Sequence, residues 1–182
     1  MVRTGPSEVP RQLNPDWRPG IASSRPGELL MGKTVLISGA GPNIGKSLAL
    51  EMGKQGAKII FTDLDRSWIT ELENQLQAQG VSSEGFAFDV RNIEDVDSLC
   101  ALLDQKDISL DVVVHNAKLE YKNSISLLDF DLHEWVQTYH TNVFGPLYLT
   151  KCVVERMRSR GRSASIIFLT SICQFNPCGR SS

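Results

Sequence analysis

Between residues 33 and 171, short apolar runs alternate with longer segments in which apolar residues recur every three or four positions. Short continuous apolar runs are typical of buried strands, and the longer spacing is typical of amphipathic helices. The runs predict five strands, at residues 35–38, 58–62, 85–88, 112–115 and 165–169.

The segments after the first, second, third and fourth strands each carry a helical pattern. The residues expected to face the core are, helix by helix, Ile44, Leu48 and Met52; Ile69, Leu72 and Leu76; Ile93, Val96, Leu99, Cys100 and Leu103; and Leu147, Val153, Val154 and Met157. A capping box of Asp131 and Glu134 predicts an additional short helix through Trp135, before the last long helix begins at about Asn142.

Continuously apolar strands separated by amphipathic helices predict a parallel sheet covered on both faces. Right-handed crossovers then give a doubly wound α/β sheet, the Rossmann fold, with ligands at the carboxyl ends of the strands. Five of the eight prolines lie in residues 1–31, so no helix or strand can run between them. We expect residues 1–31 to form a disordered or loosely docked extension and residues 32–182 to form one nucleotide-binding domain.

The turn after the first strand reads SGAGPNIG and spans residues 38–45. Gly39 and Gly45 lack a Cβ atom, which lets the chain turn sharply and lie close to a ligand and to the sheet. Asn43 stands where a third glycine would be expected, and Asn tolerates left-handed backbone. Ile44 opens the next helix, whose positive N-terminus favours an anion such as a nucleotide diphosphate. Glycine also occurs in ordinary strand-to-helix turns, so this turn needs support from its context.

Asp63 supplies that support at the end of the second strand. It follows the turn at about the distance where an acidic residue meets the adenosine ribose of a dinucleotide. A carboxylate there accepts hydrogen bonds from the two ribose hydroxyls and repels a 2′-phosphate, which favours NAD over NADP. The alternative is a helix N-cap, a position that Asp65 or Ser67 is equally able to fill.

Three further polar residues stand at successive strand ends. Asp89 follows the third strand, Asn116 the fourth and Ser171 the fifth. Each by itself is compatible with a loop or cap position. Because carboxyl ends of parallel strands meet at one edge of the sheet, the set together predicts a ligand site there.

The composition and net charge limit the classes of partner that we expect the chain to bind. A net charge of −2 gives no reason to expect nucleic acid or an anionic membrane surface. The longest aliphatic or aromatic run, 166–169, is far too short to cross a bilayer. The four cysteines show no metal-binding spacing, so we expect no metal and a reduced, cytoplasmic compartment.

The chain resembles the short-chain dehydrogenase/reductase family from about residue 32 to residue 171. The resemblance rests on six motifs that occur in the family's order. The matching residues are Ser38, Gly39, Asn43 and Gly45 in the glycine-rich turn; Asp63; Asp89 and Val90; His115, Asn116, Ala117 and Lys118; Asn142 to Gly145; and Ser171.

The resemblance implies hydride transfer between a nicotinamide cofactor and an alcohol or carbonyl substrate, and a homo-oligomer for a full-length form. The implied roles are Gly39, Asn43, Ile44 and Gly45 at the pyrophosphate; Asp63 at the adenosine ribose; Asp89 and Val90 around adenine; Asn116 and Ala117 along the nicotinamide ribose; and Asn142 and Ser171 in the catalytic set. Two positions depart from the family. Lys118 replaces a glycine and is expected to crowd the nicotinamide side, and His115 is expected to be a half-buried strand residue bonded to backbone.

The family's Tyr-x-x-x-Lys pair is absent from the 182 residues. In the family it begins about a dozen residues after the serine, and each tyrosine here is followed four positions later by Ile125, Val143 or Cys152. We expect a fragment or early-terminated form of an oxidoreductase, inactive alone. The alternative is a non-catalytic nucleotide-binding or interaction module that ends here. A sugar-nucleotide or flavin binder is disfavoured by Asn142 and Ser171.

Overall fold

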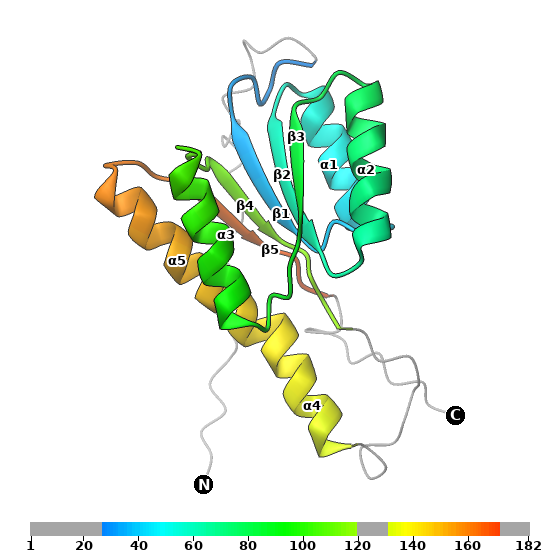
Figure 1. Cartoon of the computed structure of the whole chain (residues 1–182), viewed down its shortest axis with the longest axis vertical. Coiled ribbons are helices and arrows are strands. Elements are labelled where there is room, and N and C mark those ends of the chain that lie inside the picture. Colours follow the sequence, from blue (N-terminus) through cyan, green and yellow to red (C-terminus); the bar gives the residue numbers. More distant parts are fainter. Residues whose placement is uncertain (1–26, 120–130, 172–182) are drawn as a thin grey trace, which may run out of the picture.

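The computed structural model describes residues 27–119 and 131–171, which form a five-stranded parallel sheet between two layers of helices (Figure 1). The strand order is β3-β2-β1-β4-β5, which confirms the predicted doubly wound α/β fold. The strands are β1 (Thr34–Ser38), β2 (Lys58–Asp63), β3 (Ser83–Ala87), β4 (Val112–His115) and β5 (Ser165–Phe168).

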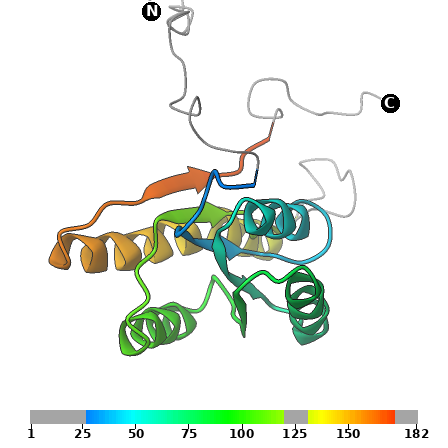
Figure 2. The same cartoon turned by 90° about the horizontal axis from the view of Figure 1, so that it is seen from above.

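Helices α1 and α2 cover one face of the sheet, and α3 and α5 cover the other (Figure 2). Their bounds are α1 (Ile44–Lys54), α2 (Arg66–Ala78), α3 (Ile93–Gln105), α4 (Leu132–Tyr139), the π-helical turn η3 (His140–Phe144) and α5 (Gly145–Ser159). Alternate residues of each strand enter opposite cores. Leu36 and Ile60 pack toward α3 and α5, whereas Ile37 and Phe61 pack toward α1 and α2.

Helix α1 packs most closely through small residues, and the predicted apolar stripe is confirmed only in part: Leu48 and Met52 pack against the core, whereas Ile44 does not. Gly45, Ala49 and Gly53 are buried, whereas Ile44 is 53% exposed. A Cβ on Gly45 would lie 2.2 Å from the carbonyl oxygen of Gly39. The helix backbone therefore lies too close to the turn for a larger residue, and the large apolar side chains occupy the flanks of the contact.

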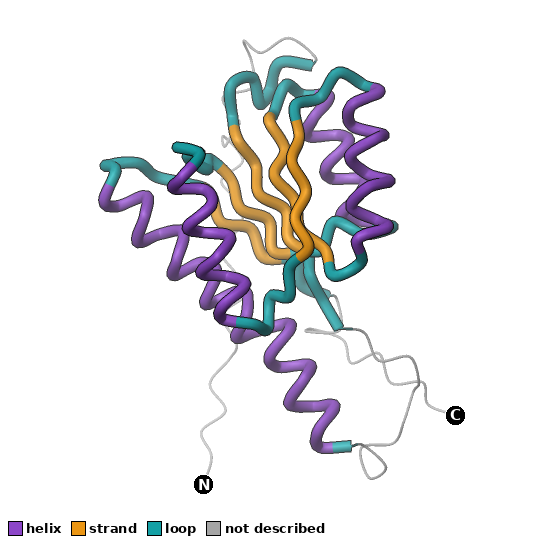
Figure 3. The backbone as a smooth tube through the Cα atoms, viewed as in Figure 1, coloured by secondary structure: helices purple, strands orange, loops and turns teal. Residues whose placement is uncertain are grey.

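The region after β4 also differs from the prediction. Asp131 caps α4 as expected, accepting a hydrogen bond from the His133 N–H. However, α4 continues through η3 into α5 without a break, so the two predicted helices are one (Figure 3). In α5 the predicted stripe is confirmed at Val153 and Met157, which are buried with Leu149 and Cys152, whereas Leu147 and Val154 are exposed.

Strand β5 departs from the prediction of a sheet covered on both faces, because three of its four residues are exposed. Ile167 is 39% exposed and Phe168 is 44% exposed. The strand register aligns the carboxyl ends of three neighbouring strands. Ser38 of β1 pairs with Thr62 of β2 on one side and with His115 of β4 on the other. The loops that follow β1, β2 and β4 therefore start at the same level along the sheet.

Across residues 27–119 and 131–171, the structure contains no helix that is both long and apolar enough to span a membrane.

Candidate nucleotide-binding site

A cleft of about 320 Å³ lies at the carboxyl ends of the strands, where the fold class places ligands. Six predicted site residues line it: Gly39, Asp63, Asp89, Val90, Asn116 and Ala117. The lining also includes Lys118, which was expected to crowd the nicotinamide side, and Gly41, Arg91 and Thr141, to which the sequence interpretation gave no role.

Both predicted glycines of the turn, Gly39 and Gly45, lie so close to other backbone atoms that a side chain would not fit. Gly39 has a φ of +69°, and a Cβ there would lie 2.5 Å from the Cα of Ala117. Asn116 fastens the same turn, because its side-chain amide donates to the carbonyl oxygen of Gly39. The loop after β4 therefore fits against the glycine turn as one rigid wall of the cleft.

The N-terminus of α1 is open toward an anion. Its N-cap residue, Asn43, has a φ of +82° and makes no side-chain capping bond, and the first turn contains no acidic residue. Uncapped N–H groups and the positive end of the helix dipole attract phosphate. Ile44 is the first residue of this helix, and the exposure of its side chain leaves the N-terminus accessible.

Asp63 faces the cleft from the end of β2. Its Oδ2 accepts a hydrogen bond of 2.7 Å from the Gly41 N–H, and its Oδ1 accepts one of 3.1 Å from the Asp65 N–H. The N-cap of α2 is Asp65, which accepts from the Ser67 N–H at 2.8 Å. The capping alternative for Asp63 is therefore wrong, and its carboxylate remains at the cleft wall.

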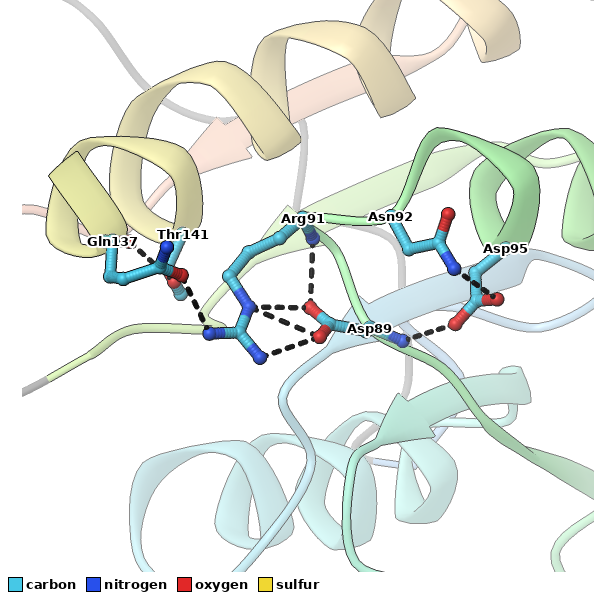
Figure 4. A network of polar contacts seen from close by, with 6 residues as sticks. All are labelled: Asp89, Arg91, Asn92, Asp95, Gln137 and Thr141. Atoms are coloured by element: carbon cyan, nitrogen blue, oxygen red, sulfur yellow. Dashed lines mark hydrogen bonds and ion pairs between the residues drawn. The ribbon is translucent and has the colours of Figure 1, made fainter. Parts of the chain in front are cut away.

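Asp89 is held by a residue that the sequence interpretation did not single out. The Arg91 guanidinium donates to both Asp89 carboxylate oxygens through Nε and Nη2, at 2.6–3.1 Å (Figure 4). These hydrogen bonds lower the pKa of the Asp89 carboxyl and raise the pKa of Arg91. Arg91 follows the Asp89–Val90 pair directly, and this basic neighbour was the available signal.

The two predicted catalytic residues, Asn142 and Ser171, lie apart from the residues that line the cleft. Asn142 lies in η3, where its amide oxygen accepts from the Leu119 N–H at 2.8 Å and its amide nitrogen donates to the Leu119 carbonyl at 3.3 Å. It therefore holds the loop after β4 and does not line the cleft. Ser171 is exposed beyond the end of β5 and does not line the cleft either.

His115 is more buried than predicted, at 3% exposure, and its ring bonds to a side chain. Nε2 shares a hydrogen bond of 2.8 Å with the Thr150 hydroxyl, and the ring stacks on Phe168 at 4.6 Å between centroids. Nδ1 has no hydrogen-bond partner among the described residues. Burial lowers the pKa of His115 to about 4, so the imidazole is neutral at neutral pH.

The part of the chain that the structure describes contains no cluster of three or more His, Cys, Asp or Glu residues able to hold a metal ion. Its polar residues instead include acidic side chains at two neighbouring strand ends in the cleft, and the uncapped α1 helix begins two residues after Pro42, which lines the cleft. Fold and cleft together define a nucleotide-binding protein of the Rossmann type.

Residues 33–182 match the family model for the short chain dehydrogenases, and the chain belongs to this family. It is 29% identical over 148 residues to L-rhamnose 1-dehydrogenase (NAD(P)(+)) from Azotobacter vinelandii, which covers 79% of the chain and 57% of the relative. It is 32% identical over 143 residues to 3-oxoacyl-[acyl-carrier-protein] reductase FabG from Pseudomonas aeruginosa, again with 79% and 57% covered. The chain thus spans less than two thirds of the length of these relatives.

Solved structures show the same fold. A short chain dehydrogenase from Mycobacterium smegmatis superposes with a TM-score of 0.77 at 26% identity, covering 84% of this chain and 63% of that one. A metagenomic short-chain oxidoreductase in complex with NADP superposes with a TM-score of 0.76 at 24% identity, covering 82% and 67%. The chain is therefore homologous to NAD(P)-dependent oxidoreductases.

Proposed function

We propose that this chain forms the cofactor-binding part of an NAD-preferring oxidoreductase that interconverts an alcohol and a carbonyl compound. The observation that carries the preference is the Asp63 carboxylate at the cleft wall, with the capping of α2 already performed by Asp65. A carboxylate in that position accepts hydrogen bonds from a ribose diol and repels a 2′-phosphate.

The cleft suits a dinucleotide, because it lies at the carboxyl ends of the strands beside the glycine turn and because α1 begins without a side-chain cap. The residues that would hold it are Gly39, Asn43, Ile44 and Gly45 at the pyrophosphate; Asp63 at the adenosine ribose; Asp89 and Val90 at adenine; and Asn116 and Ala117 at the nicotinamide ribose. The bound nicotinamide supplies the carbon that accepts or donates hydride.

On this proposal Ser171 orients the substrate oxygen, and Asn142 fixes the loop at the nicotinamide end through Leu119. Proton transfer at that oxygen needs an acid, which the family supplies from Tyr-x-x-x-Lys. The 182 residues contain no such pair, so we infer that this chain binds cofactor without turning over alcohol by itself. The substrate is a small molecule, and a full-length form is expected to be a homo-oligomer.

The decisive experiment compares NADH and NADPH binding, by isothermal titration calorimetry, for the natural chain, Asp63→Asn and Asp65→Asn. Asn at 63 removes the charge and keeps an oxygen for the Gly41 N–H, while the weaker bond from the Asp65 N–H is lost. We expect NADH to bind about tenfold more tightly than NADPH, which corresponds to about 1.4 kcal/mol. Asp63→Asn should abolish that preference, and Asp65→Asn, which changes only the cap, should preserve it.

Equal loss of both nucleotides in Asp63→Asn would contradict the specificity argument. Failure of the natural chain to bind either nucleotide would contradict the cofactor role and favour an interaction module. Alcohol-dependent NADH formation by the 182-residue chain, abolished by Ser171→Ala, would show that the inferred inactivity is wrong.

A further inference from the structure

Arg91 joins the nucleotide cleft to the long helix on its far side. Its Nε and Nη2 atoms bind the Asp89 carboxylate, and its Nη1 atom donates to the Gln137 side-chain oxygen at 3.0 Å (Figure 4). Gln137 belongs to α4, and its carbonyl oxygen accepts from the hydroxyl of Thr141, which also lines the cleft. One guanidinium therefore spans the gap between the loop after β3 and this helix.

The same network fixes the Asp89 backbone. The Asp89 N–H donates to Asp95 Oδ2 at 2.9 Å, and the Asn92 side-chain amide donates to Asp95 Oδ1 at 3.1 Å. The Arg91 N–H adds a bond of 2.9 Å to Asp89 Oδ1. Both the backbone and the carboxylate of Asp89 thus have defined orientations, which is the condition for a side chain to read one edge of a ligand.

The two acidic residues of the cleft differ in their partners. Among the described residues, Asp63 accepts from the N–H groups of Gly41 and Asp65, whereas Asp89 is held by a forked ion pair. Its Oδ2 is 2.6 Å from Arg91 Nη2, and a carboxylate oxygen accepts more than one hydrogen bond. Asp89 therefore keeps acceptor capacity while its charge is balanced, so it is suited to bind a neutral donor such as an amino group.

We propose that Arg91 is a positioning residue that makes the cleft selective for adenine. It holds the Asp89 carboxylate where that group accepts a hydrogen bond from the exocyclic amino group of the base. This inference rests on the proposed function, because it assumes that the dinucleotide places adenine beside Asp89 and Val90. The Gln137 contact stabilises the required arrangement of the guanidinium.

The test uses two dinucleotides that differ only at the base edge: NADH and reduced nicotinamide hypoxanthine dinucleotide, which carries a carbonyl in place of the amino group. We would measure both dissociation constants for the natural chain, Arg91→Met, Arg91→Lys and the matched control Arg158→Met, an exposed arginine of α5. Thermal unfolding of each variant reports whether it is folded.

The natural chain should bind NADH about tenfold more tightly than the hypoxanthine analogue, since one hydrogen bond to a charged group is worth about 1.5 kcal/mol or more. In Arg91→Met, NADH affinity should fall about tenfold while the analogue changes little, which removes the discrimination. Arg91→Lys should restore part of it, because lysine keeps the charge but not the fork. Arg158→Met should leave both affinities unchanged.

A fall of equal size for both dinucleotides would overturn the proposal, since it would mean that Arg91 only supports the fold. Unchanged discrimination in Arg91→Met would overturn it as well. If Arg91→Met does not fold, Arg91→Lys and Gln137→Leu decide instead: reduced discrimination in both supports the proposal, and full discrimination in both overturns it. If the natural chain binds neither dinucleotide, the proposed function itself fails, and this inference with it.

Discussion

The two sides of the sheet's centre differ in how completely they are packed. In β1 and β2, Leu36, Ile37, Ile60 and Phe61 have no exposed surface. On the other side, three of the four residues of β5 are exposed, and α4 buries none of its residues. We refer to β1 and β2 with α1 and α2 as the packed half, and to β5, the α4–α5 helix and the adjoining strand β4 as the open half, although β4 itself is mostly buried.

The two halves also differ in the roles proposed for their residues. Most residues proposed to hold the dinucleotide come from loops of the packed half, where backbone clashes fix the glycine turn. Ser171 and Asn142, proposed for the substrate end, belong to the open half. Large apolar side chains such as Phe144, Leu147 and Phe168 are exposed there. Surfaces of this kind mark places where further protein binds.

The largest expected effect is a difference between two isoleucines in the sheet. Ile37→Ala removes a fully buried side chain from β1 and should cost about 2–5 kcal/mol of unfolding free energy. Ile167→Ala makes the same chemical change in β5, where the side chain is 39% exposed, and should cost less than about 1 kcal/mol. Urea unfolding measures both. Equal costs would mean that β5 is covered in solution and would break the comparison.

Two glycines extend the comparison to backbone contacts. A Cβ at Gly45 would lie 2.2 Å from the Gly39 carbonyl oxygen, and a Cβ at Gly145 would lie 2.4 Å from the Val90 carbonyl oxygen. Gly45→Ala should cost about 3 kcal/mol and abolish NADH binding, because the turn cannot move. Gly145→Ala should cost about 1 kcal/mol, since the α4–α5 helix has an uncovered side and can shift outward.

The outcome would be read from urea midpoints together with NADH titrations. A larger loss for Gly145→Ala than for Gly45→Ala would show that the open half is the more rigid of the two. A Gly45→Ala variant that is folded but binds no NADH would separate the role of the turn in binding from its role in stability.

Much of this arrangement was predictable from the sequence, because strand-end residues of a parallel sheet must meet at one edge. The five strands follow from the short apolar runs, and the placement of Asp63, Asp89 and Asn116 at the cleft follows from that rule. Periodicity missed the small residues that make the closest contacts of α1, because it weights large apolar residues, whereas close approach there selects Gly45, Ala49 and Gly53.

Other features depended on partners that are remote in the chain. The Arg91 guanidinium holds its near neighbour Asp89, but it also donates to Gln137, which reaches it only through the tertiary fold. In the open half, the apolar spacing identified Leu147 and Val154 as core residues, but nothing in the described residues buries them fully. Apolar periodicity indicates that a face can be buried and does not identify what buries it.

His115, at the end of β4, is expected to make the unfolding free energy depend on pH. Among the described residues, the packed half contains no histidine that could do the same. The pKa of His115 is about 4 in the folded state and about 6.5 when unfolded, so the stabilisation is present above pH 6.5 and is lost as the pH falls toward 4. Unfolding free energy should therefore drop by about 2 kcal/mol between pH 7 and pH 5. In His115→Gln this part of the drop should be absent. The same pH profile in both proteins would assign the effect to other groups.

The smallest global effect is expected at the cap of α4. Asp131→Ala removes the bond to the His133 N–H, and an N-cap is worth about 1 kcal/mol to its helix. Because α4 buries no residue, that loss should remain local, and the global unfolding free energy should change by less than about 0.5 kcal/mol. Amide hydrogen exchange should become faster in residues 132–139 and remain unchanged in α2.

Asp65→Ala, the matched change in the packed half, should lower global stability by about 1 kcal/mol, because α2 buries Ile69, Leu72 and Leu76. A global cost for Asp131→Ala as large as that for Asp65→Ala would mean that α4 unfolds together with the core.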